Sequence, residues 1–281
     1  MSKILDGKAV AQIINEQTSQ AVRQLAKPVR LAVVYDPENA GSDLYVGMKS
    51  RQAAKVGIET QDIPLPADAN TETVQEIVRD LNQDHTITGI LIQSPLPEAV
   101  NEQIIFSTVA PSKDVDGLGA VNQGLLFADA PLPYTVAATP QGVMTLLKHY
   151  QIDPAGKTAL VIGRSQLFGR PMAALLNNAD ATVILSHRYT PAAQLKFFLK
   201  QADLVVVGVG QPDFVLGEDL KPGCVVIDVG MNVVDGKATG DVDYSSASQV
   251  ADYITPVPGG VGPMTIATLL ENTVKAAQDN N

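Results

Sequence analysis

The sequence predicts an α/β protein of two lobes, in which each lobe has a parallel sheet covered by helices. The chain has 281 residues, of which 45% are hydrophobic and 18% charged, the balance typical of a globular protein. Strand and helix periodicities alternate along it, which favours parallel strands joined by helical crossovers. A stretch rich in Pro, Gly and Asp over 111–138 separates two such series. We therefore expect two lobes rather than one.

The first series occupies residues 1–138. Asp6 is expected to cap the first helix, and Ser42 to open a second helix that runs to about Val56 and is ended by Gly57. The other elements expected here are strands over 29–35, 58–63 and 86–93 and helices over 71–82 and 98–109.

The second series has the pattern of a doubly wound nucleotide-binding unit. Thr139 as N-cap and Pro140 as first helical residue predict its opening helix, and Pro263 predicts a last helix that packs back onto the first lobe. We assign residues 1–138 and 259–281 to the first lobe and 139–258 to the second. The expected elements are strands over 158–163, 181–187, 202–210 and 224–230, with helices from about 170 and over 191–200.

Composition narrows the functional classes. A formal charge of −10 disfavours binding to nucleic acid through a broad basic surface. The sequence has no apolar run near the ~20 residues that span a bilayer and no signal-peptide core, so we expect a cytoplasmic protein that binds no membrane. Cys224 lies in an apolar run and is expected to be buried. The three histidines lack metal-ligand spacing, so we expect no metal.

A glycine-bounded turn after the strand at 158–163 could bind phosphate. Gly163, Arg164 and Ser165 begin this turn and Gly169 ends it, although the spacing is not the G-x-G-x-x-G of dinucleotide sites. An NAD site usually has an acidic residue after the next strand, whereas Arg188 stands there. A solvated loop charge is the alternative interpretation of Arg188. Together with Arg164, however, it favours the additional phosphate of NADP.

The first lobe has a candidate catalytic set. Tyr45 and Lys49 are four residues apart, so they share one face of the expected second helix. A lysine lying beside a surface aromatic is the alternative. Gln93 and Ser94 follow a strand, and a polar loop occupies 113–117. Open α/β sheets bind ligands at the carboxyl ends of their strands, which favours a site built from these residues.

Motifs over nearly the whole chain resemble, in order, those of the bifunctional methylenetetrahydrofolate dehydrogenase/methenyltetrahydrofolate cyclohydrolase family. The segments PVPGGVGPMT and KDVDG are specific signals, whereas the glycine turn alone is not. The matching segments are YVGMK (45–49), IQSPLP (92–97), KDVDG (113–117) with Asn122 and Gly124, TPQG (139–142), VIGRSQLFGRPM (161–172), DVGMN (228–232) and PVPGGVGPMT (256–265).

This resemblance implies a homodimer that oxidises methylenetetrahydrofolate with NADP and hydrolyses the methenyl product in one cleft between the lobes. By the same resemblance Lys49 is the catalytic lysine, Tyr45 stacks on the substrate ring, Gln93 bonds the lysine, and Asp116 holds the pterin. We expect burial beside Tyr45, the substrate and neutral Gln93 to lower the pKa of Lys49, so that it can relay protons.

The resemblance also implies the binding residues. The second lobe is then a Rossmann-like NADP-binding domain, and the first binds one-carbon derivatives of tetrahydrofolate. The expected NADP-binding residues are Gly163, Arg164, Ser165, Gly169, Arg188 and Met231. The expected substrate-binding residues are Tyr45, Asp116, Pro258, Gly259 and Gly262.

The sequence departs from the family pattern around the expected folate pocket. Tyr35 stands where Gly is common, Ser94 where Leu is usual, Gly119 where many members have His, and the loop over 36–41 is slightly long. These positions flank the folate pocket and bear on substrate affinity and on the balance of the two activities, but they lie outside the set of Tyr45, Lys49, Gln93 and Asp116. Other functions stay open because a fold does not dictate an activity. The alternatives are a monofunctional NADP-dependent dehydrogenase, a non-catalytic NADP sensor, and an NADP oxidoreductase acting on a small keto acid.

Overall fold

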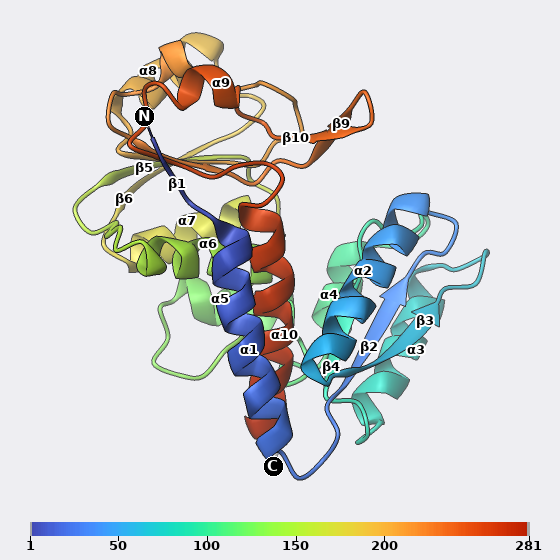
Figure 1. Ribbon diagram of the computed structural model, residues 1–281. Coiled ribbons are helices and arrows are strands. Elements are labelled where there is room, and N and C mark those ends of the chain that lie inside the picture. The colour runs from blue at the N-terminus through green and yellow to red at the C-terminus, as the bar shows by residue number, and fades with distance from the viewer. Residues whose placement is uncertain (1, 280–281) are drawn as a thin grey trace. The chain divides into compact units, whose positions relative to one another are not determined.

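The computed structural model describes residues 2–279, and within them every side chain except those at 40 and 43–45. The described chain forms two compact units. Residues 12–138 with 266–279 make the three-stranded unit, and residues 2–11 with 139–265 make the six-stranded unit. Figure 1 shows that each contains a sheet accompanied by helices. The α/β class predicted from periodicity is confirmed.

The sheet of the three-stranded unit is parallel and has the strand order β3-β2-β4. Its central strand is the apolar run that the sequence predicted. The strands are β2 (Arg30–Tyr35), β3 (Glu59–Pro64) and β4 (Gly89–Ile92), and the helices are α2 (Ala40–Val56), α3 (Thr71–Gln83), α4 (Glu102–Thr108) and α5 (Ala120–Phe127), joined by most of α1 (Gly7–Gln24) and the C-terminal part of α10 (Val261–Asp279).

The central strand β2 is buried on both faces, and its successive side chains point to opposite sides of the sheet. Ala32 and Val34 pack in a core with residues of α3 and α4. Leu31 and Val33 pack in a second core with residues of α2 and α10. Leu269 in α10 is 1% exposed in that core. The prediction that the last helix returns to the first series is therefore confirmed.

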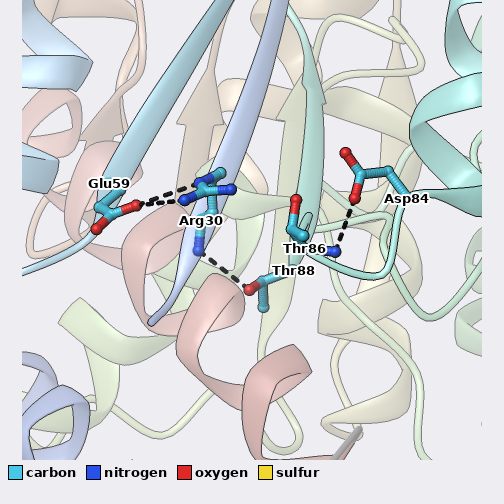
Figure 2. A network of polar contacts seen from close by, with 5 residues as sticks. All are labelled: Arg30, Glu59, Asp84, Thr86 and Thr88. Atoms are coloured by element: carbon cyan, nitrogen blue, oxygen red, sulfur yellow. Dashed lines mark hydrogen bonds and ion pairs between the residues drawn. The ribbon is translucent and has the colours of Figure 1, made fainter. Parts of the chain in front are cut away.

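A polar network ties the amino ends of these strands together (Figure 2). The Arg30 guanidinium pairs with Glu59 at 2.9 Å, and the Arg30 amide donates to the Thr88 hydroxyl at 3.1 Å. In the turn before β4, the Thr86 amide donates to the Asp84 carboxylate at 2.8 Å. Exposed ion pairs stabilise by only about 0–1 kcal/mol, so the Arg30–Glu59 pair adds little to stability.

The sheet of the six-stranded unit is also parallel, in the order β1-β11-β8-β7-β5-β6. An antiparallel hairpin projects from this unit in Figure 1. The strands are β1 (Lys3–Ile4), β5 (Thr158–Ile162), β6 (Thr182–Ser186), β7 (Leu204–Val207), β8 (Val225–Asp228) and β11 (Tyr253–Ile254), and the hairpin is β9 (Asn232–Val234) with β10 (Lys237–Thr239). The helical elements are α6 (Ala138–His149), α7 (Gly169–Asn178), α8 (Ala192–Gln201), η1 (Gly217–Asp219) and α9 (Tyr244–Ala247). Cys224 is buried, as predicted.

Three predicted helix starts were wrong. Asn39 caps α2, and its side chain accepts from the Ser42 amide at 3.0 Å, so Ser42 already lies within the helix. Thr139 is not a cap either, because α6 begins at Ala138 and the Thr139 hydroxyl lies 3.0 Å from that of Thr265. Pro263 is the third residue of α10, where a missing N–H costs no helical hydrogen bond. The predicted stop at Gly57 is confirmed by its φ of 90°.

The amino-terminal residues belong to the six-stranded unit, although they were assigned to the first lobe with 12–138. The cause is strand pairing, since Lys3 and Ile4 pair with Tyr253 and Ile254. The Lys8 amide adds a hydrogen bond of 3.0 Å to a carbonyl at residue 259. The short elements β1, α5, η1, β9, β10, α9 and β11 were also missed. Of the described helices, none is both long and apolar enough to cross a membrane.

Candidate functional site

Lys49 and Gln93 meet in the three-stranded unit. Lys49 lies on α2, and its Nζ donates to Oε1 of Gln93 at 2.8 Å. Gln93 follows β4, and its Nε2 donates to the carbonyl of Ser94 at 2.7 Å. The amide therefore uses its donor on the backbone and directs its acceptor toward the ammonium. This contact brings together two residues that the sequence analysis selected from different elements.

Asp116 lies on a loop that is held by its neighbour Asp114. The Asp114 carboxylate is buried and accepts from the amides of Leu118 and Gly119 at 3.2 and 2.9 Å and from the side chain of Asn122 at 2.8 Å. A Cβ on Gly119 would lie 2.9 Å from that carboxylate, so the departure at Gly119 coincides with a tightly packed turn. The sequence did not predict that Asp114 holds this loop, because the motif KDVDG alone does not distinguish the roles of its two aspartates.

Lys49 and Asp116 are half-buried groups of opposite charge, and each affects the pKa of the other. Burial lowers the pKa of Lys49, and the negative charge of Asp116 partly offsets this. Burial raises the pKa of Asp116 to about 6, opposed by Lys49 and reinforced by Asp114. Both pKa values are thus shifted in the direction that favours the neutral form, as expected of residues that exchange protons near pH 7. The expected lowering of the Lys49 pKa agrees with this geometry.

Three further residues singled out in the sequence lie in this unit. Tyr45 lies on α2, but its side chain is outside the described set. Among described side chains, the Ser94 hydroxyl is buried without a hydrogen-bond partner. Tyr35 ends β2 and packs against the core shared by α2 and α10. This packing explains a large apolar side chain at a position where the family commonly has Gly.

The predicted phosphate turn lines a pocket of about 650 Å³ in the six-stranded unit, and Gly163, Arg164, Ser165 and Arg188 are all among its lining residues. Gly163 has a φ of 117°, and a Cβ there would lie 2.5 Å from the Gly208 carbonyl oxygen. Only glycine fits such a position. This narrow backbone cradle, with cations at its edge, fits a phosphate-bearing cofactor.

Both arginines of this pocket lie near one exposed aromatic ring. The guanidinium carbons of Arg164 and Arg188 are 5.9 and 4.8 Å from the ring centroid of Tyr189. Nη2 of Arg188 also donates to the Tyr189 hydroxyl at 2.9 Å. Tyr189 was missed by the sequence analysis, although its place directly after Arg188 was the available signal.

The other residues expected to bind ligands occupy different places in this unit. Gly169 begins α7 and lies against the Gly163 carbonyl, with no space for a Cβ, so its part is packing beside the pocket. Met231 is 47% exposed, and its methyl group lies 3.5 Å from where a Cβ on Gly262 would be. Pro258 is exposed, and Gly259 has a φ of 108°.

Comparison with known families decides the assignment. The model for the tetrahydrofolate dehydrogenase/cyclohydrolase catalytic domain matches residues 5–116, and the model for the NAD(P)-binding domain of the same family matches residues 137–281. The chain belongs to the tetrahydrofolate dehydrogenase/cyclohydrolase family. The resemblance found in the motifs is thus confirmed.

Relatives of this family member match over their full length. The Bifunctional protein FolD of Leuconostoc citreum (strain KM20) is 68% identical over 279 residues, covering 99% of each chain. The crystal structure of the Campylobacter jejuni bifunctional enzyme FolD covers 100% of both chains with a TM-score of 0.97 and 40% identity. The Trypanosoma brucei enzyme, complexed with NADP cofactor and inhibitor, has a TM-score of 0.94 and 35% identity, covering 99% of this chain and 98% of that one.

Proposed function

We propose that this family member oxidises 5,10-methylenetetrahydrofolate with NADP and hydrolyses the resulting 5,10-methenyltetrahydrofolate to 10-formyltetrahydrofolate. The observation that carries the proposal is the Lys49–Gln93 contact beside Asp116, with opposed pKa displacements. Full-length relatives that are named bifunctional support both activities. Both reactions act on the same one-carbon unit of the folate.

The oxidation demands alignment more than acid–base chemistry. When bound, NADP supplies the nicotinamide carbon that accepts a hydride from the methylene group. Asp116 serves by accepting hydrogen bonds from the pterin amino and ring N–H groups, a charge-assisted contact that fixes the orientation of the substrate. Tyr45 is assigned to stack on the substrate ring. Pro258, Gly259 and Gly262 are assigned to the wall of the folate site.

The hydrolysis adds water to the methenyl carbon, breaks its bond to N5 and releases one proton. Lys49 is the group assigned to that proton, because a lowered pKa leaves part of the lysine neutral and able to accept it at Nζ. Gln93 keeps Nζ in place through its Oε1. Since Gln93 carries no charge, it does not restore the ammonium form as a carboxylate would.

NADP is assigned to the six-stranded unit. The backbone turn at Gly163 and Ser165 is assigned to the pyrophosphate, with Gly169 packed behind it, and Arg164 and Arg188, which line the same pocket, are assigned to the 2′-phosphate. Met231 is the remaining residue assigned to the cofactor. Folate binding is assigned to the three-stranded unit, and the protein is expected to act as a cytoplasmic homodimer.

A spectroscopic assay tests both activities. The purified chain is mixed with methylenetetrahydrofolate and NADP, then with NAD, and the decay of authentic methenyltetrahydrofolate is followed separately. We expect faster reduction of NADP than of NAD, and accelerated decay. Reduction without accelerated decay would favour a monofunctional dehydrogenase. Absence of both would favour a non-catalytic NADP-binding protein.

A further inference from the structure

A buried carboxylate ties together one wall of the pocket assigned to NADP. Asp241 is fully buried, and its Oδ2 accepts from the amides of Val209 and Gly210 at 2.6 and 3.0 Å. Its Oδ1 accepts from the amide of Gln211 at 2.9 Å and from the side chain of Asn232 at 2.8 Å. Three successive N–H groups of the segment after β7 thus converge on one side chain, an arrangement that suits an anion.

A second buried aspartate holds the first in place. Asp228, which ends β8, accepts at Oδ1 from the amides of Gly230 and Asp241 at 2.9 and 3.0 Å and at Oδ2 from the amide of Val242 at 2.9 Å. Among the described ion pairs, none involves either carboxylate. The partners of the Asp241 side chain are therefore three peptide N–H groups and one side-chain amide. Burying a carboxylate in this way is costly unless its hydrogen bonds are complete.

The segment held by Asp241 borders the cofactor pocket. Gly208, Val209 and Gln211 are lining residues of the same pocket as Arg164 and Arg188. In a planar trans peptide the carbonyl points opposite to the following N–H. When the Val209 amide points to Asp241, the Gly208 carbonyl must point away from it. That carbonyl is the atom which leaves no room for a Cβ at Gly163 in the phosphate turn.

We propose that Asp241 is a positioning residue for the cofactor, whose carboxylate holds segment 208–211 in the orientation that the phosphate turn requires. Asp228 supports it through the Asp241 backbone amide. This inference rests on the proposed use of NADP in that pocket. A preformed wall reduces the ordering cost of binding, so loosening it weakens affinity for NADP more than affinity for folate.

The decisive variant is Asp241→Asn, which keeps the shape but replaces one accepting oxygen with an N–H₂ group that cannot accept a hydrogen bond. At least one backbone amide of the segment then loses its partner, a loss typically equivalent to about a ten-fold change in an equilibrium. We expect the dissociation constant for NADP, measured by calorimetry, to rise by about ten-fold. The KM for methylenetetrahydrofolate should change by less than about two-fold.

Asp114→Asn is the matched control, because Asp114 is also buried and also caps backbone amides, but in the three-stranded unit. It should lower the melting temperature while leaving the dissociation constant for NADP unchanged. If Asp241→Asn lowered the melting temperature and bound NADP as tightly as the wild type, the role of Asp241 would be structural only and the inference wrong.

Asn232→Ala covers the case in which Asp241→Asn does not fold. It removes one donor from the carboxylate at a half-buried position, and we expect the dissociation constant for NADP to rise by about two- to five-fold. Unchanged affinity in this variant would also overturn the inference. Wild-type protein that bound no NADP would overturn the proposed function and this inference with it. Tight wild-type binding with unaffected variants would overturn the inference alone.

Discussion

The two units of the molecule use charge in different ways. In the three-stranded unit the candidate groups Lys49 and Asp116 are half-buried, and burial displaces their pKa values toward neutrality. In the six-stranded unit the candidate groups are exposed arginines and a backbone turn around Gly163. Proton transfer requires groups that change protonation near pH 7, whereas phosphate binding requires a permanent positive charge and a rigid backbone.

Lys49→Met should have the largest effect, because it removes the titrating group of the three-stranded unit without a large change in volume. We expect cyclohydrolase turnover to fall by about 10²–10⁴-fold, the usual contribution of a general acid–base group, with the dissociation constant for NADP unchanged. Decay of methenyltetrahydrofolate measures it. Lys55→Met, an exposed lysine on the same helix, is the control and should retain turnover. If folded Lys49→Met protein accelerated the decay of methenyltetrahydrofolate as much as the wild type does, Lys49 would not be the catalytic residue.

Gly163→Ala tests whether the backbone turn of the six-stranded unit is needed to bind NADP. The left-handed φ and the contact with the Gly208 carbonyl impose strain of about 1–3 kcal/mol, which corresponds to roughly 5- to 150-fold in the dissociation constant for NADP if the turn must move. Calorimetry measures the affinity. Gly156→Ala is the control, since Gly156 has a φ of 69° but open space around it. Gly156→Ala should lower the stability of the protein but leave its affinity for NADP unchanged. Equal losses of affinity in both variants would contradict the prediction.

Arg188→Gln should have a smaller effect that is confined to cofactor choice. Loss of one charged contact to the 2′-phosphate should lower kcat/KM for NADP by about ten-fold while leaving kcat/KM for NAD nearly unchanged. Lys237→Gln removes an exposed charge from the hairpin of the same unit and should leave the ratio of the two values unaltered. A similar fall for NADP and NAD would show that Arg188 does not recognise that phosphate.

In a measurement of stability alone, Asp116→Asn should produce a modest gain that depends on pH. The folded-state pKa of about 6 lies above the usual value near 4, so ionisation of Asp116 destabilises the folded chain as pH rises through that interval. We expect the variant to melt a few degrees higher than the wild type above about pH 6. The difference should vanish below about pH 4, where the carboxyl is protonated in both states. A difference independent of pH between 4 and 8 would refute the raised pKa.

Local patterns account for most of the predictions that the structure confirmed. The apolar runs of β2 and β5 identified strands, because side chains that alternate across a buried sheet must be apolar. Gly57 identified a helix end, because few other residues accept its φ. Helix starts were less predictable, since Asn39 and Ser42 are both good caps and only the path of the backbone chooses between them.

By itself, the sequence determined the α/β class, the order of its longer elements and the family, because periodicity, turn residues and motifs are local properties. Tertiary structure decided which distant residues meet. It paired Ile4 with Ile254, brought Lys49 to Gln93, and directed the amides of residues 209–211 toward Asp241. No local pattern encodes these contacts, because each one depends on how the intervening helices and strands pack and return the chain.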